Sequence, residues 1–272
     1  MLKKDDNKNE RNAQAKSKQD MHLAKQIHFE QIDSTNTWAK KHPDQWASTG
    51  VTLITASEQT AGRGRFKRLW ISPPHLNIYA TFCFWNDLQR SDMGHIPQLL
   101  AIAAAQTLEK QGFSPTIKWP NDVLLQQKKV GGILCETIIE QERQGIICGI
   151  GLNVNMPLEI LKQIDRPATS LLVEGGHPFE VSHILDVLQQ FFLAALNQFI
   201  AEGFAPFFPL FHQRSALKKG QLVRFHDHQT LIEAQFEKLH PNGSVELRLI
   251  DGNSKIFYAG EFLHFDTHES MI

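Results

Sequence analysis

Cysteine is scarce in this chain and follows no pairing pattern. Among 272 residues there are 3 cysteines, Cys83, Cys135 and Cys148, and none belongs to a Cys-x-x-Cys pair. An odd number of cysteines, all inside apolar strand-like stretches, favours reduced and buried thiols. The histidines and cysteines also lack the spacing of a zinc site. We therefore expect a cytoplasmic protein with buried thiols.

An excess of charge of either sign is absent too. The 28 Lys and Arg residues against 29 Asp and Glu residues give a formal net charge of -1. A generic nucleic-acid binder should be basic overall, so this balance argues against one but leaves room for a local cationic site. No apolar run approaches the length that a membrane span needs. We expect neither nucleic acid nor membrane as a partner.

The first residues lack large apolar side chains. Residues 3–20 contain no Val, Ile, Leu, Phe, Tyr or Trp. Such a segment cannot bury enough apolar surface to offset the entropy of ordering it, and it has no apolar region of a secretory signal. Residues 1–24 are therefore predicted to be a disordered tail.

The rest of the chain predicts two folded domains. Residues 25–217 should form an α+β catalytic domain, a mixed sheet packed with helices, since helices and strands do not alternate strictly. Short β-rich segments with Pro-Asn-Gly and Asp-Gly turns predict a small β-barrel domain over residues 218–272. The expected strands are 27–32, 51–56, 77–85, 116–119, 122–125, 130–139, 145–154, 222–225, 233–239, 244–250 and 255–262; the expected helices are 97–111, 179–201 and a short one capped by Asp33 or Ser34.

A glycine- and arginine-rich stretch, residues 60–74 (hereafter the arginine loop), is too polar to be core. Arg63, Arg65 and Arg68 concentrate positive charge among glycines, and arginine forks match phosphate oxygens. Trp70 offers a flat surface on which a purine could stack. A bare Gly-Arg-Gly-Arg would equally suit a solvated basic loop or a nucleic-acid contact.

Two further clusters carry polar groups at strand ends. Pro120 marks a strand end, so Asn121 and Asp122 should project from a turn, where they could hold Mg²⁺ together with phosphates. Lys129 enters a strand just before Gly131-Gly132, where its ammonium could neutralise charge on a phosphoryl group. The alternatives are a plain Asx turn and an exposed lysine pair.

The last cluster lies in one strand. Gly149 and Gly151 fall on one strand face and should leave an open slot, and Asn153 on the same face offers a donor and an acceptor. The alternative is a bulge followed by a turn asparagine. Each of the four clusters is weak by itself, and only their combination and order are specific.

Taken together in this order, the motifs closely resemble those of the biotin–protein ligase family. The resemblance covers about residues 27–171 and, more loosely, the small C-terminal domain. It implies a catalytic domain like that of class II aminoacyl-tRNA synthetases and biotin ligases, followed by an SH3-like barrel. The motifs that carry it are Asp33-Ser34-Thr35-Asn36, the Gln-x-x-Gly-Arg-Gly-Arg-x-x-Arg-x-Trp run at 59–70, Lys-Trp-Pro-Asn-Asp at 118–122, residues 129–134 and residues 149–153.

The resemblance also implies a role for each site residue. Those expected to bind biotin are Ser34, Thr35, Asn36, Gln59, Gly62, Arg63, Gly132, Leu134, Gly149 and Gly151. Those expected at the nucleotide are Arg65, Arg68, Trp70, Asn121, Lys129 and Asn153, with Lys129 and Arg65 as catalytic residues and Asp122 as a Mg²⁺ ligand.

The implied enzyme is an ATP-dependent ligase. It would form biotinoyl-AMP from biotin and ATP, with Mg²⁺, and transfer biotin to a lysine of a biotin carboxyl carrier protein. No tightly bound prosthetic group is expected. A related ligase for lipoate or octanoate and a non-enzymatic nucleic-acid binder remain as alternatives.

Other features bear on regulation and assembly. Lys67 stands where many relatives have glycine, and the arginine that some relatives carry near the C-terminus is not evident after Phe262. Only 32 residues precede Asp33, too few for a helix-turn-helix domain, so no repressor function is expected. A strand over 78–85 could form a homodimer at a sheet edge or lie inside the sheet.

Overall fold

Two β-sheets organise the fold, and each belongs to one part of the chain. The computed structural model describes residues 20–87 and 90–263. The larger sheet has seven strands in the order β1-β2-β3-β7-β6-β5-β4, and the second has five in the order β11-β10-β9-β8-β12. Because β1 and β2 run parallel while β2 and β3 run antiparallel, the expected mixed α+β sheet is confirmed.

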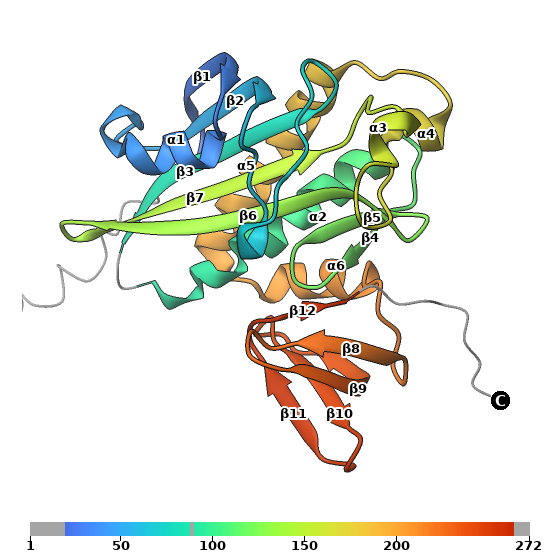
Figure 1. Ribbon diagram of the computed structural model, residues 1–272. Coiled ribbons are helices and arrows are strands. Elements are labelled where there is room, and N and C mark those ends of the chain that lie inside the picture. The colour runs from blue at the N-terminus through green and yellow to red at the C-terminus, as the bar shows by residue number, and fades with distance from the viewer. Residues whose placement is uncertain (1–19, 88–89, 264–272) are drawn as a thin grey trace, which may run out of the picture.

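The larger sheet and its helices span most of the chain (Figure 1). Its strands are β1 (Leu23–Ile32), β2 (Val51–Gln59), β3 (Ile78–Asp87), β4 (Thr116–Lys118), β5 (Asp122–Leu125), β6 (Lys128–Glu140) and β7 (Arg143–Leu152). The α-helices are α1 (Thr35–Lys41), α2 (Ile96–Lys110), α3 (Leu158–Leu161), α4 (Leu171–Gly175), α5 (Val181–Glu202) and α6 (Phe208–Gln213). The sequence did not predict α3, α4 and α6, because helices this short carry no apolar period.

Local signals explain where the principal helices begin and end. The Ser34 hydroxyl accepts a hydrogen bond from the backbone N–H of Thr37 and caps α1, as expected. Pro97 lies in the first turn of α2, where its missing N–H costs nothing. Gly203 ends α5 with φ at +75°, a conformation that glycine adopts without strain.

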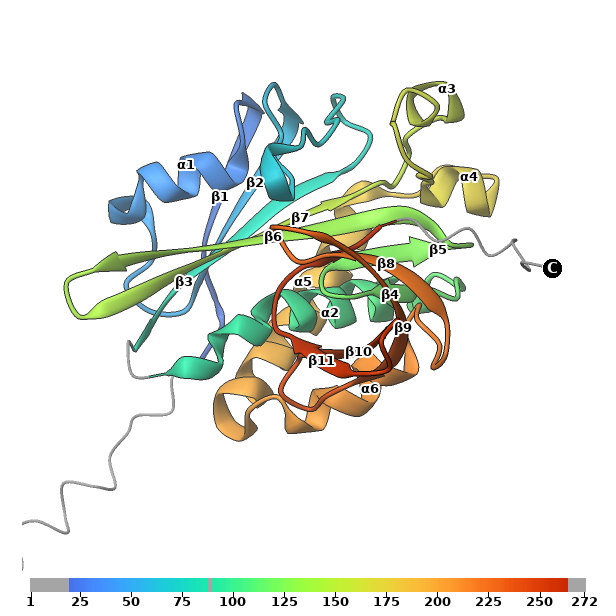
Figure 2. The same cartoon turned by 60° about the horizontal axis from the view of Figure 1, so that its bottom comes forward.

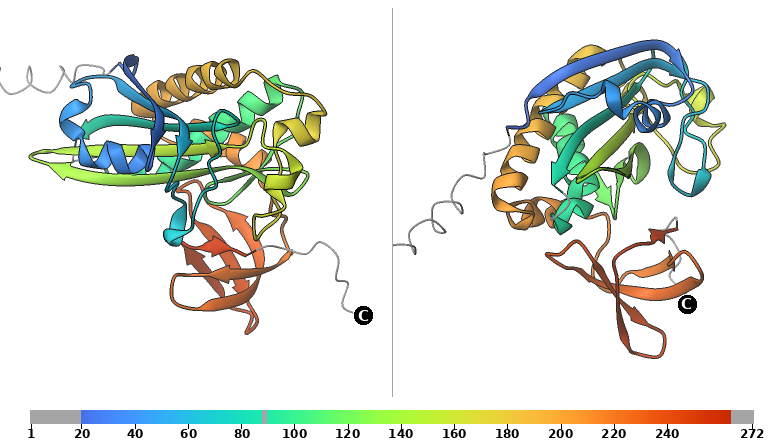
Figure 3. Two further views of the ribbon diagram at one scale, coloured as in Figure 1. Left: turned by 45° about the horizontal axis from the view of Figure 1, so that its top comes forward. Right: turned by 90° about the vertical axis from the view of Figure 1, so that its left-hand side faces the viewer.

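The helices cover the sheet unequally. Long helices α2 and α5 pack on one face, while α1 lies on the other (Figure 3). Phe82, Leu100 and Phe192 are fully buried on the side of α2 and α5. A smaller apolar cluster with Trp46, Cys83 and Trp85 lies under α1. The central strands are therefore packed against apolar residues on both faces.

Strands β8 to β12, hereafter the small domain, form an antiparallel sheet that curls on itself (Figure 2). Its strands are β8 (Leu222–His226), β9 (Leu231–Leu239), β10 (Val245–Leu249), β11 (Ser254–Phe257) and β12 (Glu261–Phe262). The single strand expected over 255–262 is wrong. The chain bends at Gly260, whose φ is +144°, and β12 crosses over to pair with β8.

Three other expectations need correction. β1 begins at Leu23 and Met21 is fully buried, so the end of the predicted tail is ordered, while residues 1–19 lie outside the described part. β3 lies between β2 and β7, so it cannot form an edge-to-edge dimer. By length and composition α5 could cross a membrane, contrary to the expectation that no run is long enough. Its apolar residues nevertheless pack into the core beside α2.

Candidate functional site

A cavity of about 430 Å³ opens between the arginine loop, the N-terminus of α1 and strands β6 and β7. Every site residue predicted from the sequence lines this cavity except Gly62. Their positions in the chain are far apart, and the sheet brings them together. The four motif clusters, which are separate in the sequence, therefore lie around one cavity.

The floor of the cavity is a glycine-rich ladder. Gly132 lies opposite Gly151, and Leu134 opposite Gly149, in the antiparallel pairing of β6 with β7. A Cβ atom on Gly149 would lie 2.0 Å from Asn36 Oδ1, and one on Gly151 would lie 2.3 Å from the Trp70 ring. The prediction of an empty slot over these glycines is wrong. The space above Gly149 holds the Asn36 amide, and the space above Gly151 holds the Trp70 indole, so both side chains form walls of the cavity.

One end of the cavity holds a network of neutral polar groups. The side-chain oxygen Oε1 of Gln59 accepts hydrogen bonds from the Thr35 N–H at 3.0 Å and from the Thr35 hydroxyl at 3.2 Å. The Thr81 hydroxyl bonds to Asn36 Oδ1 at 2.7 Å, and the Gln59 amide donates to Ser72 Oγ at 3.0 Å. Thr35, Asn36, Ser72 and Thr81 are buried and Gln59 is half-buried, so the hydrogen bonds fix these groups in place for a neutral polar ligand.

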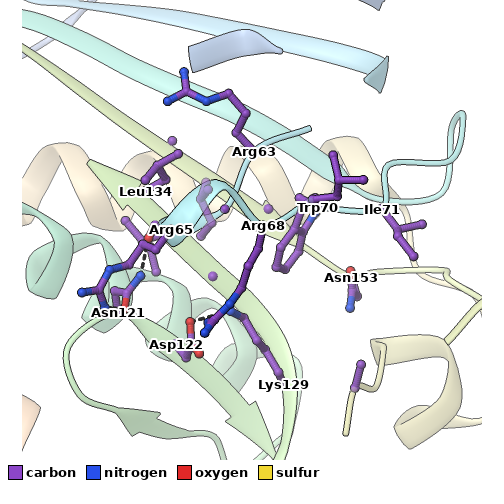
Figure 4. Close-up of a pocket in the computed structure, with 18 of the residues that line it drawn as sticks. Arg63, Arg65, Arg68, Trp70, Ile71, Asn121, Asp122, Lys129, Leu134 and Asn153 are labelled. Atoms are coloured by element: carbon purple, nitrogen blue, oxygen red, sulfur yellow. Dashed lines mark hydrogen bonds and ion pairs between the residues drawn. The ribbon is translucent and has the colours of Figure 1, made fainter. Parts of the chain in front are cut away.

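The other end of the cavity is cationic (Figure 4). Lys129 Nζ lies 2.6 Å from Asp122 Oδ1 and 5.4 Å from the centroid of the Trp70 ring. Arg65 donates to Asn121 Oδ1 at 3.1 Å, and Arg68 points toward the same end. Fixed cations beside glycine-rich backbone suit a phosphorylated ligand.

Arg63 does not belong to this cationic end. Its guanidinium points away from Arg65 and Arg68 and lies 2.9 Å from Glu136 Oε1 on β6. Glu136 also pairs with Lys40 of α1 at 3.2 Å. The concentrated three-arginine loop read from the sequence is thus divided, because the backbone turns between positions 63 and 65 and a carboxylate binds the first side chain.

Two cations at the cavity are poorly hydrated. Burial lowers the pKa of Arg65, although the carboxylates of Glu261 and Asp122 counteract part of the effect. Burial likewise lowers the pKa of Lys118, against the influence of the same two carboxylates. A phosphate oxygen would replace the lost hydration of both groups, so each cation should bind an incoming anion strongly.

Two polar atoms at the cavity have no partner. Among the described residues, the buried side-chain nitrogen and oxygen atoms without a hydrogen bond are Trp70 Nε1 and Asn153 Oδ1. Asn153 still donates through Nδ2 to the Thr169 carbonyl at 3.0 Å, which fixes the amide orientation. One donor and one acceptor are therefore left for a ligand. A bound ligand that paired with both atoms would remove the cost of burying them without a hydrogen bond.

The arginine loop needs an unusual backbone. Gly62 does not line the cavity; a Cβ there would lie 2.4 Å from the Trp70 carbonyl oxygen, so the glycine permits the loop to fold back on itself. Phe66 and Lys67 have φ of 57° and 60°, a left-handed conformation that favours glycine. This explains physically why glycine suits the position of Lys67.

Sequence reasoning missed several residues at the site. Lys118, Glu261 and Arg166 line the cavity, and Glu136 anchors Arg63 beside it. Lys118 was detectable, because it begins the Lys-Trp-Pro-Asn-Asp motif. Glu261 and Arg166 were not, since they come from the small domain and from the segment between α3 and α4, which only the tertiary fold brings near.

The small domain contributes directly to the site. The Gly260 carbonyl accepts a hydrogen bond from Arg65 at 3.0 Å, and Glu261 forms an ion pair with Arg68. The tip of the arginine loop accordingly lies beside β8 and β12 (Figure 3). The small domain therefore reaches the cationic end of the cavity through Glu261, and the sequence carries no arginine after this residue.

The donor set of the cavity fits a magnesium ion only together with phosphate. The described residues hold no group of three or more His, Cys, Asp or Glu able to bind a metal by themselves. Asp122 supplies one carboxylate and Asn121 one amide oxygen. Mg²⁺ commonly takes one or two protein carboxylates and completes its shell with substrate oxygens and water, so this pair fits a nucleotide-borne ion.

Comparisons with known proteins agree with this site. The family model described as "Biotin/lipoate A/B protein ligase family" matches residues 28–153. The chain is 30% identical to the biotin–[acetyl-CoA-carboxylase] ligase of Paracoccus denitrificans, over 84% of this chain and 98% of that protein. It is 29% identical to the bifunctional ligase/repressor BirA of Bacillus subtilis, over 86% of this chain and 72% of that protein.

A solved structure shares the fold over both domains. It is the biotin protein ligase of Aquifex aeolicus in complex with biotin and ATP, with a TM-score of 0.73 and 27% sequence identity. The match covers 89% of this chain and 98% of that chain. The small domain is therefore part of the shared architecture.

Proposed function

Because this chain is a ligase of the biotin/lipoate A/B protein ligase family, we propose that it activates biotin with ATP as biotinoyl-AMP and transfers biotin to a lysine of a biotin carboxyl carrier protein. The observation that carries the proposal is the cavity itself. A neutral polar end, at Thr35 and Gln59, and a cationic end, at Arg65 and Lys129, line one continuous cavity. Biotin has a neutral ureido ring and an anionic carboxylate, and its adenylate adds a phosphate beside that carboxylate.

In the proposed complex, the polar end holds the ureido ring. Ser34, Thr35, Asn36 and Gln59 would supply donors and acceptors, with Arg63 beside them. Gly62, which lies outside the cavity, would act only by letting the arginine loop fold back. The valeryl chain would run along Gly132 and Leu134 toward the cationic end. This orientation places the carboxylate near Lys129 and keeps the neutral ring away from the charged groups.

The first reaction would be adenylation. A carboxylate oxygen of biotin attacks the α-phosphorus of ATP, a new O–P bond forms, and the bond to the pyrophosphate oxygen breaks. Arg65, Arg68 and Lys129 would stabilise the charge that builds on the phosphoryl oxygens. Trp70 and Asn153, each with one unpaired polar atom, would contact the adenosine part.

Mg²⁺ would be held by Asp122 and the ATP phosphates, and would supply charge neutralisation there. In the described structure the Asp122 carboxylate is paired with Lys129 at 2.6 Å. When the nucleotide binds, Lys129 would turn to the phosphate and leave the Asp122 oxygen available. The ion pair thus keeps both groups in position before substrate arrives.

The decisive experiment follows biotin through both reactions. Calorimetry should detect biotin binding alone, and ATP with Mg²⁺ should then release pyrophosphate only when biotin is present. A biotin-accepting domain of acetyl-CoA carboxylase should gain the mass of one biotinyl group. Transfer of lipoate in preference to biotin, in a direct competition, would reject the substrate assignment but keep the acyl-transfer chemistry.

Further parts of the proposal concern the setting of the enzyme. We propose that it acts in the cytoplasm, which its three free cysteines support, and does not repress transcription, which its net charge of -1 supports. Absence of a shift of carboxylase-gene promoter DNA by the purified protein is the expected result. A homodimer stays a prediction that sedimentation would test, and β3 is not its interface.

A further inference from the structure

A second hollow lies between the catalytic domain and the small domain. This groove has a volume of about 560 Å³. Ser91, Gly94 and Gln98 line it from the catalytic domain, and His228 and Tyr258 line it from the small domain. None of these five residues lines the cavity described above.

The groove and the cavity share a thin wall. Arg65, Asn121 and Leu134 line both hollows, and a hydrogen bond of 3.1 Å joins Arg65 to Asn121. The groove therefore ends against the residues that the proposed function places around the acyl phosphate. A group that lay in the groove would therefore be next to Arg65 and Asn121, which also line the cavity.

We propose that this groove is the port for the acceptor: the target lysine of the carrier protein and the residues on either side of it. The proposal rests on the proposed function, because a protein amine must reach an adenylate that already fills the cavity. Residues of both domains line the groove, so a chain segment lying in it would contact both. Its rim also carries exposed aromatic rings, Phe66 at 43% and Tyr258 at 72% exposed, of the kind that protein interfaces favour.

The chemistry at the shared wall is suited to an amine. The lysine nitrogen attacks the carbonyl carbon of the adenylate, the C–N bond forms, the C–O bond to the phosphate breaks, and AMP leaves. The amine gives up one proton to water. A lysine side chain that passes beside the Arg65 guanidinium is disfavoured as an ammonium ion, so the wall promotes the neutral, nucleophilic form.

Gly94 allows the groove to be filled without disturbing the protein. A Cβ built at this position meets no atom within 4 Å. Gly94→Phe should therefore place a ring in the groove, and Gly94→Ala is the matched control that changes the backbone in the same way but fills little space. Neither variant alters a residue of the cavity.

The two half-reactions separate the proposed roles. Hydroxylamine is a small nucleophile that can reach the adenylate by other routes. Gly94→Phe should therefore form the adenylate, and lose it to hydroxylamine, at wild-type rates. Transfer to a biotin-accepting domain of acetyl-CoA carboxylase should fall by roughly tenfold or more in kcat/KM. Gly94→Ala should transfer within about twofold of wild type, the range of a near-neutral contact.

A second variant tests the other side of the groove. Tyr258→Ala should raise the KM for the acceptor domain several-fold, while Ile250→Ala, an exposed apolar residue outside both hollows, should not. Undiminished transfer by both Gly94→Phe and Tyr258→Ala would overturn the port. Absence of any adenylate in the wild-type enzyme would instead reject the proposed function, so the two failures are distinguishable.

Discussion

Single side chains at the cavity are held by several partners, and the clearest example is the ammonium group of Lys129. It lies within an ion pair of 2.6 Å with Asp122 and above the Trp70 ring, at the strand start that faces the cationic end. Its neighbour Lys128 is exposed and pairs with Glu174 at 3.6 Å, away from the cavity. The two adjacent lysines thus differ in burial and in ion-pair partner, and only Lys129 lines the cavity where a phosphate could bind.

We predict that Lys129→Ala reduces adenylate formation by about a hundredfold or more, the size seen when a donor to a developing oxyanion is removed. Pyrophosphate release in the presence of biotin measures the step. Lys128→Ala is the control and should release pyrophosphate at the wild-type rate. Near-normal release by Lys129→Ala would overturn its role.

Glu136 is a residue that positions others. It holds Arg63 at 2.9 Å and Lys40 at 3.2 Å, and Asn36 Nδ2 lies 3.4 Å from its other oxygen. Burial alone would raise the pKa of Glu136, but hydrogen bonds and charges from Arg63 and Lys40 outweigh burial and lower it. The carboxylate therefore ties the arginine loop and α1 to β6.

We predict that Glu136→Gln raises the KM for biotin by roughly tenfold, because a charged hydrogen bond contributes about 1.5–3 kcal/mol. Glu140→Gln, exposed on the same strand, should leave the KM unchanged. The folded-state pKa of Glu136 is lowered, so its stabilisation is present above the unfolded-state pKa and is lost as pH falls through the folded-state pKa. The free energy of unfolding of Glu136→Gln should therefore fall less at acid pH than that of the wild type. Identical pH profiles of the unfolding free energy for the two proteins would contradict this prediction.

At the scale of elements, the glycines of β6 and β7 leave space above the sheet, and side chains from α1 and from the arginine loop fill that space. The glycines of this ladder accept the side chains of Asn36 from α1 and Trp70 from the arginine loop. Any side chain larger than hydrogen at these positions must displace a cavity wall. The strand pair is therefore a template on which the site is assembled.

We predict that Gly149→Ala destabilises the protein by about 1–3 kcal/mol, the usual cost of overpacking, and abolishes biotin binding. Urea unfolding and calorimetry measure the two effects. The double variant Asn36→Ala/Gly149→Ala should recover most of the stability, because the clash is with the Asn36 amide, but not the biotin affinity. Failure of the second change to restore stability would show that the strain lies elsewhere.

At the scale of the whole molecule, the two domains meet at the motif that carries Asn121 and Asp122. Trp119 donates from Nε1 to the Gly243 carbonyl of the β9–β10 turn at 2.8 Å. Its ring packs near Phe225 and Phe262 of the small domain. The small domain thus supports the cationic end of the cavity, where we propose that the nucleotide binds, so we expect adenylation to require the small domain.

We predict that Trp119→Phe costs about 1 kcal/mol of stability, through the lost hydrogen bond, and raises the KM for ATP. Trp46→Phe is a matched control, because Trp46 donates to the Ala39 carbonyl at 3.1 Å far from the domain interface. It should lose similar stability without a change in KM. If both variants changed the KM for ATP equally, the contact of Trp119 with the small domain would have no specific role in ATP binding.

The sequence by itself determined the local features. Apolar periodicity and turn residues placed the main strands and both long helices, since burial of alternate or every third to fourth residue depends only on nearby residues. The clusters of glycines and arginines and the Lys-Trp-Pro-Asn-Asp motif were weak one by one, and their order along the chain, through the family resemblance that it carries, gave the residues that line the cavity. These signals lie within runs of about ten residues, and a chain carries such information whatever its final fold.

Only the tertiary structure decided which distant groups meet. It turned Arg63 toward Glu136, filled the glycine ladder with Asn36 and Trp70, and brought Glu261 to Arg68. It also placed β3 inside the sheet and created a second hollow between the domains. Such contacts join residues from different elements, and no periodic pattern records them, because their energies depend on packing across the whole molecule.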